Sequence, residues 1–405
     1  MTETPRPTRD ELLRLLGEAS DLEHSLTCQY LFAAFSLKRV GDGLNDAQMT
    51  TVMGWARTLL MVARQEMEHL GLVANLLTAV GGSPWFGHPR FPYATPLFGH
   101  QMALEPFSTQ TIEKFVCFER PDEVDPADAF CRAAPDPGRN VSALYERIRG
   151  LLIALDSPDL FVGPVKAEVT GLQLGTDFPR VGAMGGGYDV YLTTVQDLPS
   201  ALAAVDLIME QGEGAPQDTE ISHYRRFLDV LEEVRATPGL DPARDVVANP
   251  SLTRAHPGTT HVTDPAAREV LAVFDAAYRT MLLLLLRLFA ATDESEDELT
   301  TLRGIGFFPL MTMAVRPLAE VLTTLPAFAG QPDGPRAGPS FDTGGPVVFL
   351  PHRRAAWAVL AEQLDDLATA AGAAAAQPGV PERVGYIARS LTLIARRFAA
   401  GMEVT

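Results

Sequence analysis

Cysteine and basic residues are scarce in this sequence, and each shortage excludes a class of protein. The three cysteines, Cys28, Cys117 and Cys131, are too few and too scattered for a disulfide framework or a thiolate metal site. We therefore expect a reducing compartment and a cytoplasmic protein. Lysine and arginine number 33 against 51 aspartates and glutamates, a formal net charge of −18. Because so acidic a chain repels phosphate backbones and anionic lipid, we expect neither a nucleic-acid nor a membrane partner.

Long hydrophobic runs are also missing. The longest apolar stretch, Met281–Leu286, is cut by Arg287 and falls far short of the roughly 20 residues that a membrane span needs. The first residues, MTETPRPTRDELL, contain acids and prolines but no apolar core, so we do not expect a signal peptide. Hydrophobic residues make up 46% and charged residues 21% of the 405, as in soluble globular proteins. This length predicts two or three compact units.

Capping signals and the spacing of apolar residues predict a mostly α-helical protein. Thr8, followed three residues later by Glu11, has the form of a capping box, and Asp46 is the expected N-cap of a second long helix. Further helices are predicted at residues 108–120, 141–155, 200–211, 219–234, 265–291, 297–324, 353–376 and 382–400. We divide the chain into an N-terminal bundle (1–235), a connection (236–264) and a C-terminal helical region (265–405).

Several acids fall on the apolar faces of these predicted helices. At about 100° per residue, Glu23 lies among the leucines and alanines of the first helix. Glu66 lies in the apolar stripe of the second helix, and His69 flanks it one turn on. In the third, Glu119 shares a face with Phe115. These positions predict carboxylates that point into the protein.

The later helices add further candidates. Glu213 follows the buried side of its helix, and His223 lies beside an aromatic face with Glu220 three residues before it. By the same reasoning Glu68 and Glu146 are expected to face solvent.

Buried ionised carboxylates are costly unless they are paired or bind a metal. The spacing Glu-x-x-His occurs as Glu66–His69 and as Glu220–His223, and residues at i and i+3 project from one helical face. With a glutamate from each of the other helices, this is the ligand plan of di-iron and di-manganese helical bundles. Oxygen and imidazole ligands suit Fe or Mn better than Zn or Cu. The competing interpretation is structural pairing of these acids with histidine or with the arginines of the second helix.

At these residues the sequence resembles the ferritin-like domain family of bacterial pigment and alkaloid pathways, which includes the iminophenylpyruvate dimer synthase and chromopyrrolate synthase relatives. The synthases are much longer chains, and this sequence corresponds to their ferritin-like part. The matching segments are LEHSLTCQYLFAAFSLK (Leu22–Lys38), ARQEMEHLGLVANLLTAVGGSP (Ala63–Pro84), FERPD (Phe118–Asp122), IMEQGEGAP (Ile208–Pro216), SHYRRF (Ser222–Phe227), NPSL (Asn249–Leu252) and AGPSFD (Ala337–Asp342).

The resemblance implies a ferritin-like helical bundle with an additional C-terminal helical region. It also implies a non-haem iron site of one or two ions, with manganese as the alternative metal. The implied ligands are Glu23, Glu66, His69, Glu119, Glu213 and His223. The resemblance favours Glu119 over Glu146 and Glu213 over Glu220, while Glu210 and Glu220 are treated as alternative or supporting ligands.

Together these features predict an oxidative enzyme of natural-product biosynthesis that uses O₂ or peroxide on a small amino-acid-derived substrate. Tyr30, one face above Glu23, is the candidate catalytic donor, and the aromatic-rich segment 83–106 is a candidate pocket wall. Two alternatives stay open: a peroxide-handling or iron-binding protein without an organic substrate, and a non-catalytic helical scaffold. The apolar stretch Val270–Phe289 predicts either a core helix or the interface of a homo-oligomer.

Overall fold

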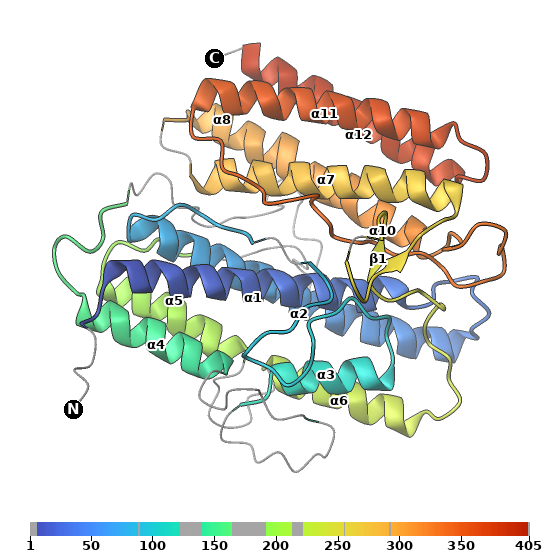
Figure 1. Cartoon of the computed structure of the whole chain (residues 1–405), viewed down its shortest axis with the longest axis horizontal. Helices are drawn as coiled ribbons and strands as arrows, with labels where there is room; N and C mark the ends of the chain where they lie inside the picture. The colour runs from blue at the N-terminus through green and yellow to red at the C-terminus, as the bar shows by residue number, and fades with distance from the viewer. Residues whose placement is uncertain are drawn as a thin grey trace.

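The computed structural model describes residues 6–87, 90–121, 131, 140–163, 192–212, 222–254, 256–290 and 293–403. Two long helices, α1 (Arg9–Ser36) and α2 (Asp46–Ala79), run through the centre of the molecule and pack along each other (Figure 1). Every residue of α1 from position 22 to position 30 is buried, because other helices cover this part of α1 on several sides. The prediction of a mostly α-helical protein is confirmed.

Side-chain caps fix where the two long helices begin. Thr8 accepts a hydrogen bond from the backbone N–H of Glu11, as its position in the sequence predicts. Helix α2 is capped by Asn45 and not by the predicted Asp46. The reason is a reciprocal pair of bonds between Asn45 and Gln48, which satisfies two backbone donors at once.

Four short helices lie beneath α1 and α2 in two pairs, α4 with α5 and α3 with α6 (Figure 1). They are α3 (Thr109–Phe118), α4 (Val141–Ala154), α5 (Leu198–Gln211) and α6 (His223–Ala236). Helix α4 packs against α1, and both α5 and α6 pack against α2. Two pairs of short helices thus stand where a bundle of continuous helices would have two long ones, so that helix ends meet in the middle of the bundle.

The C-terminal helices form a separate layer over α1 and α2 (Figure 1). They are α7 (Pro265–Phe289), α8 (Glu296–Thr300), η3 (Thr301–Phe307), α9 (Phe308–Leu310), η4 (Met311–Val315), α10 (Arg316–Leu322), α11 (Arg353–Ala375) and α12 (Glu382–Glu403). A short parallel pair, β1 (Pro250–Ser251) and β2 (Thr260–His261), precedes them. The additional C-terminal helical region is confirmed, while the boundaries at 235 and 264 stay predictions.

One continuous helical stretch, Glu296–Leu322, is long and apolar enough to cross a membrane when judged by length and composition alone. Half of its most apolar window is buried inside the protein. Core helices of soluble proteins have the same property, so this stretch is weak evidence for a membrane span.

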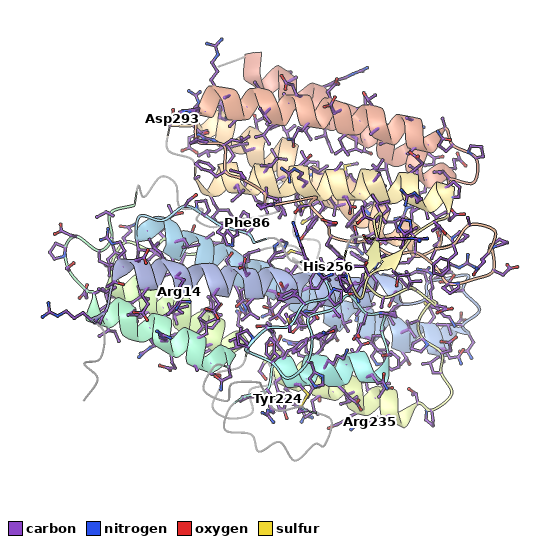
Figure 2. All side chains as sticks on the ribbon, in the orientation of Figure 1. Arg14, Phe86, Tyr224, Arg235, His256 and Asp293 are labelled. Atoms are coloured by element: carbon purple, nitrogen blue, oxygen red, sulfur yellow. A yellow bond between two sulfur atoms is a disulfide. The ribbon has the colours of Figure 1, made fainter. Side chains whose placement is uncertain are left out.

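The predicted irregular segment 83–106 packs between the layers instead of standing apart from them. The Phe86 ring is buried between α1 and α7 and meets Phe289 edge-on, with ring centroids 5.7 Å apart (Figure 2). Further along, Tyr93 and Met102 form a single antiparallel bridge. The described part of this segment thus helps to join the C-terminal layer to the bundle.

Cys117 and Cys131 form a disulfide, which the sequence analysis did not anticipate. The two cysteines are 14 residues apart in the chain, and their Cα atoms are 5.5 Å apart. Spacing alone does not show such a pair, because the pairing depends on the path of the chain after α3 ends at Phe118. The third cysteine, Cys28, is a buried free thiol.

Cys131→Ser is expected to lower the free energy of unfolding by about 3 kcal/mol, the chain-entropy cost of opening a loop of about 15 residues. Chemical denaturation of the variant and the wild type under oxidising conditions measures this difference. Adding a reductant should bring the wild type to the stability of the variant. Equal stability under oxidising conditions would show that the bond does not form in solution.

Candidate metal centre

Five buried side chains from four helical segments converge in the middle of the bundle. Among the described residues they form two groups with metal-ligand geometry: Glu23, Glu66 and His69, and Glu66, Glu119 and His223. Within each group the ligand atoms lie within 4.8 Å of one another. None of the five residues is more than 2% exposed, and Glu66 belongs to both groups.

The helix breaks of the lower layer explain how these side chains meet. Glu66 and His69 point from one face of the continuous helix α2, as their i, i+3 spacing requires. Glu119 is the C-cap of α3, and His223 is the first residue of α6. Both ends therefore stop at the level of the site, where their side chains face inward instead of along a helix surface.

The distances are nearly symmetric about Glu66. Its Oε2 lies 3.3 Å from Nδ1 of His69, and its Oε1 lies 2.8 Å from Nδ1 of His223. The same Nδ1 of each histidine is also 3.5 Å from a second carboxylate, Oε2 of Glu23 for His69 and Oε2 of Glu119 for His223. The two imidazole rings stack with centroids 5.4 Å apart. Each half of the site thus has two carboxylate oxygens and one imidazole nitrogen around a common point.

Several of these atoms lack the hydrogen bonds that buried polar atoms normally make. Oε1 of Glu66 and both ring nitrogens of His223 are buried and make no hydrogen bond to any described residue, although Oε1 and Nδ1 are close. Orphaned buried acceptors are costly. A cation between them would satisfy these lone pairs, and the oxygen and imidazole donors suit Fe or Mn. By this test the residues fit a metal.

The same crowding moves the pKa values of the five groups. Burial raises the pKa of Glu23 to about 8, although His69 lowers it, and burial also raises the pKa of Glu119. Burial alone would raise the pKa of Glu66, but His223 and His69 together hold it below its usual range. Burial lowers the pKa of His223, but the nearby carboxylates of Glu66 and Glu119 raise it by more, so that the pKa is about 9. In the absence of a metal, protons on Glu23 and His223 therefore reduce the negative charge of the buried carboxylate cluster at neutral pH.

Three neighbouring side chains hold the ligands in place. The hydroxyl of Tyr30 donates to Oε1 of Glu119, and that of Tyr145 donates to Oε1 of Glu23. Nε2 of His69 lies 3.1 Å from Oε1 of Gln211, the last residue of α5. Donation from Nε2 would leave Nδ1 as the nitrogen that binds a metal between the two glutamates.

Sequence reasoning selected Tyr30 but missed Tyr145 and Gln211. Tyr145 shares the buried face of α4 with Leu144 and Ile148. Its position therefore predicts a core residue and gives no sign of its partner.

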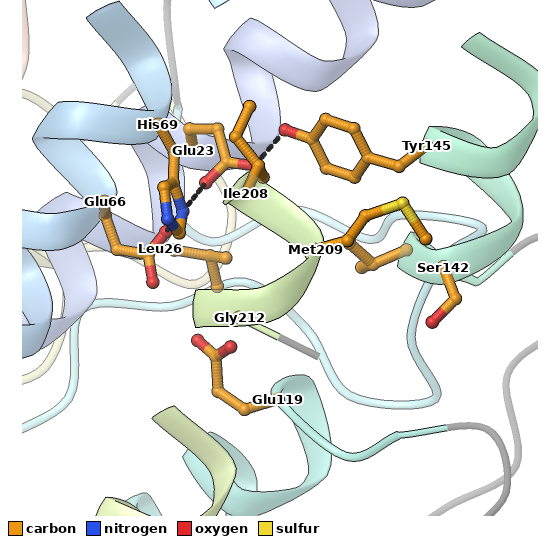
Figure 3. A pocket seen from close by; sticks show the side chains of 11 residues that line it. Glu23, Leu26, Glu66, His69, Glu119, Ser142, Tyr145, Ile208, Met209 and Gly212 are labelled. Atoms are coloured by element: carbon orange, nitrogen blue, oxygen red, sulfur yellow. Dashed lines mark hydrogen bonds and ion pairs between the residues drawn. The ribbon is translucent and has the colours of Figure 1, made fainter. Parts of the chain in front are cut away.

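A small cavity of about 20 Å³, room for about one water molecule, lies against the site, and Figure 3 shows the side chains around it. Its walls are Glu23, Leu26, Glu66, His69, Glu119, Val141, Ser142, Tyr145, Ile208, Met209 and Gly212. Four of the five candidate ligands thus border the cavity, together with the facing sides of α4 and α5. None of the described residues of segment 83–106 borders it, so the expectation that this segment is a wall of the pocket is not supported.

The remaining predicted acids have different outcomes. Glu213 and Glu220 lie outside the described residues. Glu210 is exposed on α5 and belongs to neither ligand group, because Ile208 takes the buried face and a residue two positions on points away from it; its role as an alternative or supporting ligand stays a prediction. Glu146 is exposed, as predicted.

Glu68 was expected to face solvent but is 4% exposed. One of its carboxylate oxygens lies 3.7 Å from Arg64. The expectation was wrong because α2 contacts α1, α5, α6 and α7, which leaves this part of the helix little free surface.

Comparison with known proteins gives the family and two relatives of this chain. The sequence pattern of the ferritin-like family matches residues 16–232. The chain is 31% identical to dichlorochromopyrrolate synthase of Lentzea aerocolonigenes over 98% of its own length and 41% of that protein. It is 30% identical to 2-imino-3-(indol-3-yl)propanoate dimerase of Chromobacterium violaceum, over 83% of this chain and 34% of that protein. The chain therefore spans well under half the length of these relatives.

Among solved structures, a ferritin-like protein from Caulobacter vibrioides aligns with a TM-score of 0.49 and 19% identity. The alignment covers 78% of this chain and 96% of that one. The family match extends over more than half of the 405 residues and includes Glu23, Glu66, His69, Glu119 and His223. This chain belongs to the ferritin-like family.

Proposed function

We propose that this chain is a metal-dependent oxidative enzyme with a two-ion centre, acting on a small imino acid derived from an aromatic amino acid. The observation that carries the proposal is the shared carboxylate: the two oxygens of Glu66 face Nδ1 of two different histidines, and each Nδ1 also faces a second glutamate. One ion would be held by Glu23, Glu66 and His69, and the other by Glu66, Glu119 and His223.

Iron fits this donor set, and manganese is the alternative. When bound, such ions supply one-electron redox chemistry with O₂ or peroxide. The chain's own residues provide the rest of the site. The carboxylates and imidazoles fix the charge of the centre, and Leu26, Ile208 and Met209 give the cavity its apolar walls. These walls exclude bulk water from the small space beside the ligands, where an oxidant such as O₂ would reach the ions.

The names of the relatives support the substrate class. One is a dimerase of 2-imino-3-(indol-3-yl)propanoate, and the other is a synthase of dichlorochromopyrrolate. We propose the same kind of coupling here. Two imino acids each lose one proton and one electron, and a new carbon–carbon bond joins them. The two electrons and two protons reduce O₂ to H₂O₂, or H₂O₂ to two molecules of water.

The experiment uses the full chain loaded with Fe(II). An amino-acid oxidase generates the imino acid from tryptophan in the same vessel, and mass spectrometry follows the products. The expected result is a species with the mass of two imino acids less two hydrogens, together with consumption of oxidant beyond that of the amino-acid oxidase alone. Glu146→Gln, an exposed change on α4, should behave like the wild type.

Three other outcomes contradict the proposal. Peroxide consumption that is unaffected by the imino acid indicates peroxide handling without an organic substrate. Iron binding with no turnover of either compound indicates an iron-binding protein. A chain that binds no metal is a helical scaffold whose inward acids are only paired with histidine.

A further inference from the structure

The two outer glutamates of the centre are held in the same way by tyrosines from different helices. Tyr145 of α4 donates to Oε1 of Glu23, and Tyr30 of α1 donates to Oε1 of Glu119. In both glutamates the other oxygen, Oε2, is 3.5 Å from the neighbouring histidine. The same tyrosine–glutamate–histidine arrangement thus occurs on both sides of Glu66, although the two tyrosines come from different helices, α1 and α4.

Neither tyrosine hydroxyl is placed for contact with bulk water. Tyr30 is fully buried and its ring packs against Phe115 and Phe227, with centroids 4.6 Å and 4.9 Å away. Tyr145 is 2% exposed. Rings held this firmly direct their O–H groups at one oxygen of each carboxylate, at little further cost in side-chain entropy.

A hydrogen bond to one carboxylate oxygen decides which oxygen is left for a metal. With Oε1 occupied by a phenol, Glu23 and Glu119 have only Oε2 directed at the histidines. Hydrogen bonds that orient metal ligands in this way typically change metal affinity by 10–100-fold.

We propose that Tyr145 and Tyr30 are a matched pair of positioning residues, each holding one outer glutamate so that it offers a single oxygen to one of the two ions. This inference rests on the two-ion centre proposed above. The pair differs in one respect: Tyr145 borders the cavity and Tyr30 does not. A small molecule that enters the cavity therefore lies beside Tyr145 and beside the Glu23 carboxylate that Tyr145 orients.

The test compares Tyr145→Phe with Tyr30→Phe, using Mn²⁺ as the probe. Each change removes one hydroxyl and keeps the ring, so each should weaken one of the two ions about 10–100-fold and leave the other near its wild-type affinity. Calorimetric titration measures the two affinities. Electron paramagnetic resonance at one equivalent of Mn²⁺ should show fewer coupled pairs and more isolated ions in each variant than in the wild type.

Tyr278→Phe is the matched control. Tyr278 is another buried tyrosine, and its hydroxyl lies 2.5 Å from Nε2 of His24, outside the two ligand groups. This variant measures what the loss of any buried phenol hydroxyl does to the fold. It should bind two Mn²⁺ ions with wild-type affinities and the wild-type spectrum.

A double-mutant cycle separates the orientation of Glu23 from any general effect of Tyr145→Phe on the fold, and Tyr30→Phe tests the same inference independently. In a Glu23→Gln background, the further change of Tyr145 should not weaken Mn²⁺ binding again, because the carboxylate that it orients is gone. Equal binding by wild type, Tyr145→Phe and Tyr30→Phe would overturn the pairing while leaving the two-ion centre intact. A wild-type chain that binds no Mn²⁺ would instead overturn the proposed centre itself.

Discussion

Glu66→Gln is expected to bind neither metal ion, whereas Glu23→Gln and Glu119→Gln should each retain one. Glu66 is the only described residue that belongs to both ligand groups, and its two oxygens face His69 and His223. An amide keeps one neutral oxygen and cannot supply the negative charge shared by two dications. We expect affinity to fall by at least about 100-fold, more than the loss of an orienting hydrogen bond costs.

Elemental analysis after loading with Fe(II) and desalting gives the number of ions per chain. The wild type should retain two ions, the two outer variants one each, and Glu66→Gln none. Glu146→Gln is the control, since it removes the same charge from an exposed position. Circular dichroism before loading shows whether each variant has kept its helices.

The outer variants make the result informative even if Glu66→Gln is unstable. Burial raises the pKa of Glu23 to about 8, so at neutral pH the metal-free protein already holds this side chain largely in its neutral form. Replacement by the neutral glutamine should therefore leave the metal-free fold intact. Two retained ions in Glu23→Gln, or one in Glu66→Gln, would be incompatible with a carboxylate shared between two halves.

The part of the site on continuous helices could be predicted from the sequence. Helical phase decides the face of a residue, so Glu23 on α1 and Glu66 with His69 on α2 could be placed inward from apolar spacing alone. The structure places all three side chains in one buried group. Their role as metal ligands stays a prediction, which the elemental analysis tests.

The residues at helix ends were harder to place. Glu119 was assigned to a helical face, yet it is the C-cap of α3, and His223 is the first residue of α6. Periodicity loses its meaning where a helix stops, since the chain direction changes there. Both side chains nevertheless reach the site, because the two helix ends meet beside Glu66.

Contacts between distant segments could not be predicted at all. The bond from Tyr145 to Glu23 joins residues 122 positions apart, and that from His69 to Gln211 joins residues 142 apart. Such pairs depend on how whole helices pack, which single-helix patterns do not encode. Glu68 shows the same limit, since the helices around α2 bury a side chain that its own pattern directs outward.

Metal binding is expected to release protons and to tighten as the pH rises from 6 to 9. In the metal-free protein the pKa of Glu23 is about 8 and that of His223 about 9, so both groups carry protons at neutral pH. A dication needs the carboxylate and the neutral imidazole, so it must displace these protons. Each displaced proton contributes about a tenfold change in affinity per pH unit below the pKa of its group.

The stability of the metal-free chain should change in the opposite direction. Glu23 ionises in the unfolded chain near its ordinary pKa of 4.5 but in the folded chain only near 8, so it opposes folding increasingly across that interval. The stabilisation from protonated His223 is complete below 6.5 and is lost as the pH passes 9. The metal-free protein should thus be less stable at pH 9 than at pH 6, and metal loading should add the most stability at the higher pH.

Titration calorimetry in buffers of different ionisation enthalpy counts the released protons, and thermal denaturation with and without Mn²⁺ gives the two stability curves. Glu23→Gln should release fewer protons in total than the wild type, because it binds one ion fewer and lacks one titrating carboxyl. Affinity that is independent of pH between 6 and 8.5 would mean that the site is already deprotonated before the metal arrives. The protons on Glu23 and His223 would then have no part in metal loading.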